Sequence, residues 1–245
     1  MLILLAVAAG CVDGASFLGL GQVLTAAMTG NTTLLGLSLG QGDAKAALRA
    51  TIALAGFVAG ALVGAAIVDR DARSAIWSPA VTFALAVELA VLVALAFAWH
   101  LLEGRGDWTI DYRYPLIAMA GIAMGIQSAA AHRVGVPGVT TTYVTGTLTN
   151  LTARLVAWLR TSRAAARGDR TSKVDPPWLP ASVWIGYGAG AMFAGAAHLA
   201  WSSGTLAPTA HQARWPSAAL VLPIGLVAAV ILIAAIVYRH RPVPT

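Results

Sequence analysis

Long apolar segments follow one another along almost the whole chain, separated by short stretches that carry the charged and turn residues. Most reach the roughly 20 residues that a helix needs to cross the hydrocarbon core of a bilayer. Backbone polar groups find no water there, so such segments must satisfy their hydrogen bonds internally, as helices do. The segments cover residues 1–20, 22–40, 46–68, 75–102, 115–131, 139–160, 181–202 and 217–238. The sequence therefore predicts an all-α, polytopic transmembrane helix bundle with six to eight crossings.

Composition excludes an ordinary soluble domain and several kinds of site. The chain is 58% hydrophobic and 11% charged, against roughly 45–50% and 25% in soluble domains. The net charge of +6 comes mostly from basic residues between apolar segments, where they act as orientation signals rather than as a nucleic-acid groove. Cys11 is the single cysteine, so an internal disulfide or Cys-rich metal site is excluded. We expect one integral membrane domain over residues 1–245, with the lipid bilayer and a small solute or ion as partners and with no nucleic acid, metal or cofactor.

One element occurs twice. The stretch V-L-T-A-A-M-T-G-N-T-T at residues 23–33 returns as V-T-T-T-Y-V-T-G-T-L-T at residues 139–149, with Thr29 on Thr145 and Gly30 on Gly146. In both copies threonines are four residues apart, so on a continuous helix they would share one face. Hydroxyl groups between apolar segments indicate that this face meets something polar.

Glycines repeat in the same way. Four-residue glycine spacing lets helix backbones touch in lipid, where packing holds helices together. The glycines are Gly56, Gly60 and Gly64 in the third segment and Gly186 and Gly190 in the seventh, and Gly10 corresponds to Gly125. The chain thus reads as two related halves, residues 1–102 and 115–238, and its glycine-rich faces are candidates for joining copies into a homo-oligomer.

Two membrane arrangements remain open. If all eight segments cross, the halves are parallel repeats. If the second and sixth segments enter and return on the same side, each half crosses three times and the halves are inverted, a common transporter plan. Lys and Arg counts do not separate these plans, but both place the C-terminus and residues 161–180 in the cytoplasm.

Several short motifs resemble a known family. They are A-G-C-V-D-G-A-S-F-L at 9–18, M-T-G-N at 28–31, M-G-I-Q at 124–127 and T-T-Y-V-T-G-T-L-T at 141–149. Together they resemble the YoaK-like DUF1275 membrane proteins of bacteria over nearly the whole chain. The resemblance implies a small multi-pass protein of the inner (cytoplasmic) membrane and leaves its function open. It carries over Asp13, Thr29, Gly30, Asn31, Gln127, Thr145 and Gly146, whereas Ser128 stands where the family pattern leads us to expect asparagine.

Two carboxylates lie within apolar segments, Asp13 in the first and Glu88 in the fourth. Each costs several kcal/mol in a bilayer unless it is paired, hydrated or protonated. Proton or cation coupling is one reading. The other is a hydrogen-bonded or buried carboxyl group that fixes helix packing.

The polar residues of the repeated element form the candidate solute site. Asp13, Thr25, Thr29, Gly30, Asn31, Gln127, Thr141, Thr145, Gly146, Thr149 and Asn150 are its predicted lining. In the alternative reading, the threonine hydroxyls bond their own helix or the polar side chains merely join neighbouring helices.

No nucleophile and base stand at a recognisable catalytic spacing, and no catalytic residue is predicted, so we do not expect an enzyme. We expect a secondary transporter or channel-like carrier of a small solute. The competing expectation is a membrane scaffold or sensor that transports nothing and whose polar residues only pack helices.

Overall fold

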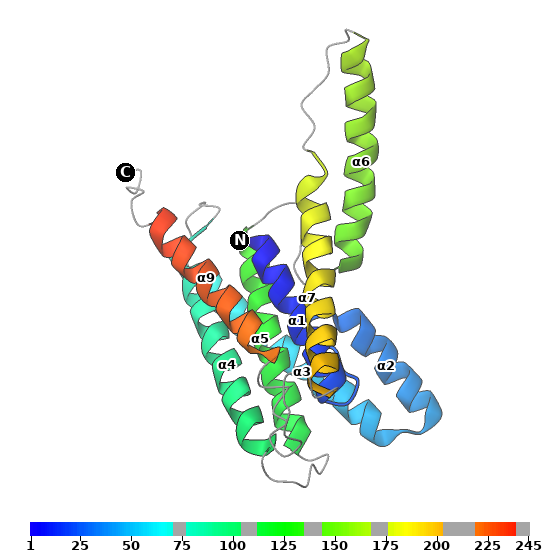
Figure 1. Cartoon of the computed structure of the whole chain (residues 1–245), viewed down its shortest axis with the longest axis vertical. Helices are drawn as coiled ribbons and strands as arrows, with labels where there is room; N and C mark the ends of the chain where they lie inside the picture. The colour runs from blue at the N-terminus through cyan, green and yellow to red at the C-terminus, as the bar shows by residue number, and fades with distance from the viewer. Residues whose placement is uncertain (71–76, 104–111, 135–143, 168–175, 203–218, 239–245) are drawn as a thin grey trace.

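The fold was analysed in a computed structural model, which describes residues 1–70, 77–103, 112–134, 144–167, 176–202 and 219–238. Within these ranges every regular element is a helix, as predicted. The helices are α1 (Leu2–Gly19), α2 (Met28–Gln41), α3 (Ala44–Val68), α4 (Pro79–Glu103), α5 (Arg113–Val134), α6 (Val144–Ala166), α7 (Trp178–Ser202) and α9 (Val221–Tyr238). They form one bundle from which α6 extends beyond the other helices (Figure 1).

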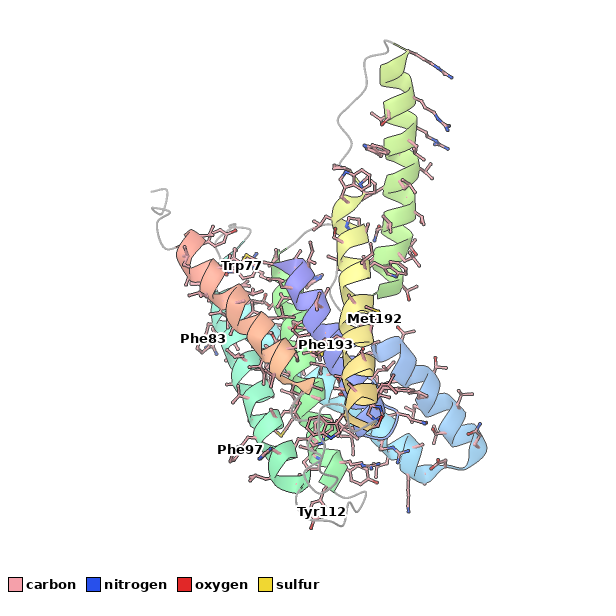
Figure 2. All side chains as sticks on the ribbon, viewed as in Figure 1. Trp77, Phe83, Phe97, Tyr112, Met192 and Phe193 are labelled. Carbon is pink, nitrogen blue, oxygen red and sulfur yellow. The ribbon has the colours of Figure 1, made fainter. Side chains whose placement is uncertain are left out.

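Among the described helices, five are long and apolar enough to cross a membrane: α1, α3, α4, α5 and α9. In α1 and α5, 61% of the most apolar stretch is buried inside the bundle, against 22–33% in the other three. Therefore α1 and α5 are the central helices. The outer helices expose large apolar side chains such as Phe83 and Phe97 of α4 and Met192 of α7, as expected of surfaces that face lipid (Figure 2).

The second apolar segment is not one continuous helix. Gly21 and Gln22 have φ values of +89° and +63°, and helix α2 begins only at Met28 and has 14 residues. The left-handed conformation at Gly21 and Gln22 turns the chain back after α1. The prediction that Thr25 and Thr29 share a helix face is therefore wrong, because Thr25 lies in the turn before α2.

A second tight turn joins α2 to α3. Gly42, with φ +73°, ends α2 in the left-handed conformation that favours glycine, and its N–H bonds to the carbonyl oxygens of Leu39 and Ser38. The Asp43 carboxylate then accepts the N–H of Ala46 at 3.0 Å and caps α3. These two caps make α2 and α3 adjacent antiparallel neighbours.

Glycines hold two pairs of helices in backbone contact, as predicted. A Cβ atom built on Gly60 of α3 would lie 2.7 Å from the carbonyl carbon of Ile122 in α5. One built on Gly190 of α7 would lie 2.8 Å from the backbone nitrogen of Cys11 in α1. Both glycine-rich faces are thus covered by helices of the same chain, and joining copies through them would displace this packing.

The order of these contacts gives the relative directions of the helices. Contacts advance together along α3 and α5, and along α7 and α1. The pairs are Gly56 with Ala118, Gly64 with Ile126, Gly186 with Ile3 and Gly190 with Val7. In each pair the two helices therefore run parallel. The end of α1 lies beside the start of α3. Gly21 follows α1, Arg49 lies in the second turn of α3, and a Cβ on Gly21 would lie 3.0 Å from Cδ of Arg49.

Candidate functional site

The Asp13 carboxylate lies inside the bundle and is saturated by donors. Its side chain belongs to α1 and is 2% exposed. Oδ1 accepts the N–H groups of Thr25 and Ala26, both at 2.6 Å. Oδ2 accepts the N–H of Ala27 at 3.0 Å and the hydroxyl of Tyr187 from α7. One side chain thus connects α1, α7 and the start of α2.

The backbone donors to Asp13 lead directly into helix α2, since Thr25 and Ala26 lie in the turn before it and Ala27 is its N-cap residue. Ala27 is the N-cap residue of α2 and has no side chain that can accept a hydrogen bond. The first N–H groups of a helix lack partners within it and form the positive end of its dipole. Of these groups Asp13 accepts only the N–H of Ala27, and its carboxylate lies beside the positive helix end, where a negative charge is favourable. Asp13 thus bonds to the first copy of the repeated element, and most of these bonds are made with backbone groups.

Hydroxyl groups form a second layer around this carboxylate. Thr25 is fully buried, and its Oγ1 lies 3.4 Å from Asp13 Oδ1 and 3.3 Å from Ser16 Oγ. At these distances the hydroxyls make weak bonds. Sequence reasoning identified Thr25 but missed Ser16, which lies three residues after Asp13 and so falls on the same face of α1.

Asn31 closes the turn before α2 from the other side. Its Oδ1 accepts the Leu24 N–H at 3.0 Å, and its Nδ2 donates to the Leu24 carbonyl oxygen. The side chain is fully buried. Asn31 therefore pairs with both backbone groups of Leu24 in the same way as a neighbouring strand would, and it fixes the turn relative to α2.

Gln127 joins the two central helices. It is fully buried on α5 and donates from Nε2 to the Leu5 carbonyl oxygen of α1 at 3.0 Å. A buried side chain that forms a hydrogen bond with the backbone of another helix helps to hold the two helices together. Leu5 lies more than two helical turns before Asp13 on α1, so Gln127 is not part of the Asp13 cluster.

The remaining predicted residues do not join this cluster. Thr29 is exposed, while Gly30 packs against Leu24. On α6, Thr149 bonds the Thr145 carbonyl oxygen at 3.1 Å and Asn150 bonds that of Gly146 at 2.9 Å. The side chains of Thr145, Thr149 and Asn150 are exposed. Thr141 lies outside the described residues.

Sequence reasoning also missed Tyr187, whose hydroxyl donates to Asp13 from 174 positions away. The position of Tyr187 in the sequence could have indicated this contact. Tyr187 follows Gly186 and precedes Gly190 in the glycine-rich segment, so it lies at the edge of the face that packs on α1. A hydroxyl at such a helix contact normally finds a hydrogen-bond partner.

Glu88 presents the opposite case to Asp13. It is fully buried on α4, and neither carboxyl oxygen has a hydrogen-bond donor in the described part of the chain. An enclosed carboxyl group without donors is costly in either protonation state, and far more costly when ionised. Its burial therefore opposes the stability of the bundle.

Replacing Glu88 with methionine, which has a similar length and no charge, should stabilise the protein by about 1–3 kcal/mol because the partnerless carboxyl group is removed. The measurement is thermal unfolding of the detergent-purified chain. Val87→Met, at the neighbouring half-buried position, is the control and should change stability by about 0.5 kcal/mol or less. A clear loss of stability in Glu88→Met alone would show that the carboxyl group has a stabilising partner.

Comparisons with known proteins agree with the membrane architecture. The chain matches the family described as "Protein of unknown function (DUF1275)" over residues 1–233. It is 38% identical over 151 residues to the "UPF0700 transmembrane protein YoaK" of Bacillus subtilis (strain 168). That alignment covers 62% of this chain and 64% of the relative, less than two thirds of the relative's length. No solved structure matches the chain. Because the family match extends over most of its length, the chain belongs to the DUF1275 family of multi-pass membrane proteins.

Proposed function

We propose that the protein is a secondary transporter or channel-like carrier of a small solute. The observation that carries this proposal is the short helix α2, whose N-terminal end is held by the buried Asp13 carboxylate. Its 14 residues extend roughly 21 Å, less than the roughly 30 Å of a hydrocarbon core. Broken helices that direct their N-termini at an interior polar site are characteristic of secondary transporters.

The proposed membrane arrangement has six crossings, by the five apolar helices α1, α3, α4, α5 and α9 and by α7, which packs along α1. Because α1 ends where α3 begins, residues 20–41 enter and return on one side; we call them the re-entrant segment. Because α3 and α5 run parallel, and α7 and α1 do too, α5 ends on the side where α7 begins. Helix α6 connects α5 to α7 in the chain, so it starts and ends on the same side and does not cross either.

Three crossings in each half make the halves, residues 1–102 and 115–238, inverted repeats. Their interfaces support this relation. Exchanging the halves replaces α1, α2 and α3 with α5, α6 and α7. The contact between α3 and α5 then corresponds to that between α7 and α1, and the contact between α2 and α3 corresponds to that between α6 and α7. The glycines follow the same exchange, with Gly60 replaced by Gly190 and Gly125 by Gly10.

In this proposal the Asp13 cluster is the element that changes during transport. Charge-assisted bonds from backbone N–H groups and Tyr187 hold the re-entrant segment against α1 and α7. A proton or cation that neutralises the carboxylate would weaken those bonds. The turn before α2 would then be free to move, and an anionic or polar solute group could take the place of Asp13 at the helix end. Glu88 is the second proposed coupling group.

A second candidate is a scaffold or sensor that transports nothing. One observation favours it: the chain's own donors already occupy both oxygens of Asp13. The cluster would then serve only to hold the re-entrant segment in place. This candidate requires no solute to bind between the helices.

A ligand screen separates the two candidates. Thermal unfolding of the purified chain is measured against metabolites, ions and drugs at two pH values. A specific ligand at about 100 times its dissociation constant should add about 2.7 kcal/mol of stability. Thr25→Val, which removes the buried hydroxyl beside Asp13 and keeps the backbone N–H, should abolish that gain. The control is Thr33→Val, because this exposed hydroxyl only bonds the Thr29 carbonyl oxygen of its own helix. A panel without any stabilising compound would favour the scaffold.

A further inference from the structure

A cavity of about 350 Å³ opens at the end of the bundle where α1 ends and α3 and α5 begin. Its lining includes two guanidinium groups, from Arg49 and Arg113, and the amide of Gln22. Phe17 and Leu18 border the same cavity and are 42% and 41% exposed. The cavity is thus lined by two basic side chains together with partly exposed apolar ones.

Both arginines lack an acceptor for a buried N–H. In the part of the chain that the structure describes, the Nε atoms of Arg49 and Arg113 are buried and have no hydrogen-bond partner. The two side chains are half-buried as a whole, but a buried N–H donor without an acceptor loses its water without compensation. Two such donors at one cavity are available for an acceptor that the described residues do not supply.

The fold holds these groups in place. Gly21 has φ +89°, and a Cβ atom there would lie 3.0 Å from both Cδ and Nε of Arg49. The absence of a side chain at Gly21 therefore gives the Arg49 side chain room to lie along the turn. Arg113 is the first residue of α5, where the positive end of the helix dipole adds to its charge.

We propose that this cavity binds an oxyanion of the phosphate or carboxylate class between Arg49 and Arg113. The planar guanidinium fork matches the paired oxygens of such groups, and the resulting bonds are charge-assisted. In the six-crossing arrangement both arginines lie on the side of the membrane opposite the cytoplasm. Lys and Arg set the orientation of a membrane protein from the cytoplasmic side, so that rule does not explain these two arginines. The oxyanion has two possible sources, a free solute anion or the headgroup of an anionic lipid.

Two binding measurements on the full chain identify the source. The first is the thermal shift caused by inorganic phosphate in neutral detergent. The second is retention of phosphatidylglycerol relative to phosphatidylcholine, counted by native mass spectrometry. Arg49→Gln and Arg113→Gln should each weaken binding about tenfold, as expected for one lost charge-assisted bond. Lys45→Gln removes the same charge from an exposed position of α3 and should leave binding unchanged.

The outcomes differ in what they establish. A phosphate effect that both arginine variants lose identifies a free anion, and selective loss of phosphatidylglycerol identifies a lipid headgroup. Arg49→Lys and Arg113→Lys retain the charge and should bind with intermediate affinity, even if the glutamine variants fold poorly. The proposal is overturned if the four arginine variants match Lys45→Gln in both measurements. Because none of the residues that line the cavity bonds to Asp13, Thr25→Val should bind phosphate or phosphatidylglycerol as the parent does, whether or not the protein is a transporter.

Discussion

Valine at Gly190 is expected to destabilise the protein by about 3 kcal/mol, whereas valine at Gly188 should have little effect. A Cβ at Gly190 would overlap the Val7 carbonyl oxygen and lie 2.8 Å from the backbone nitrogen of Cys11. These are backbone atoms of the central helix α1, so relief requires the helices to separate. At Gly188, two residues away on α7, a Cβ would meet nothing within 4 Å.

The measurement is the unfolding temperature of each variant in detergent, with the monodisperse fraction from size-exclusion chromatography as a second readout. Because both substitutions place valine in the same helix, the change in helix propensity is shared and cancels. Gly60→Val at the α3–α5 contact should cost about as much as Gly190→Val. Equal stability of the Gly190 and Gly188 variants would contradict the backbone contact between α1 and α7.

Asp13→Asn is expected to cost about 3 kcal/mol or more, through the loss of several charge-assisted bonds at one buried site. Asparagine keeps one acceptor oxygen but presents an NH₂ group to the N–H groups of Thr25 to Ala27. Asp43→Asn is the matched control, because Asp43 caps α3 at the exposed surface with one bond to Ala46. Asparagine caps about as well as aspartate there, so its cost should be close to zero.

Thermal unfolding at neutral pH and limited proteolysis across residues 20–41 test this prediction together. In Asp13→Asn the re-entrant segment should be cut faster, while the parent and Asp43→Asn should resemble each other. If Asp13→Asn is as stable and as resistant as the parent, Asp13 does not hold the start of α2, and the proposed role of this cluster is wrong.

Apolar segments and glycine spacing predicted much of the fold. A bilayer leaves the backbone few alternatives to helices, so the all-α architecture followed from segment length. Close contact at Gly60 and Gly190 followed from their spacing, because only a residue without a side chain allows backbones to touch. Which helix each glycine meets did not follow, since that choice depends on contacts between segments far apart in the sequence.

The candidate site was predicted only in part. The sequence marked Asp13, Thr25 and Asn31, and the structure brings all three to the start of α2. Helical periodicity misplaced Thr25, because it assumes a continuous helix and the turn at Gly21 ends that continuity. The donors to Asp13 are mainly backbone N–H groups and the distant Tyr187, and neither is marked by residue spacing.

The most direct test of the proposed architecture is the side of the membrane reached by single cysteines in a Cys11→Ala background. Lys45→Cys and Tyr112→Cys introduce thiols at exposed positions. In intact cells, a membrane-impermeant maleimide should label both from outside, whereas Asp69→Cys and Arg163→Cys should react only after permeabilisation. That result would place the re-entrant segment on one side and make the halves inverted. Protection of Lys45→Cys and Tyr112→Cys, together with outside labelling of Asp69→Cys, would mean that α2 crosses the membrane and would contradict the account.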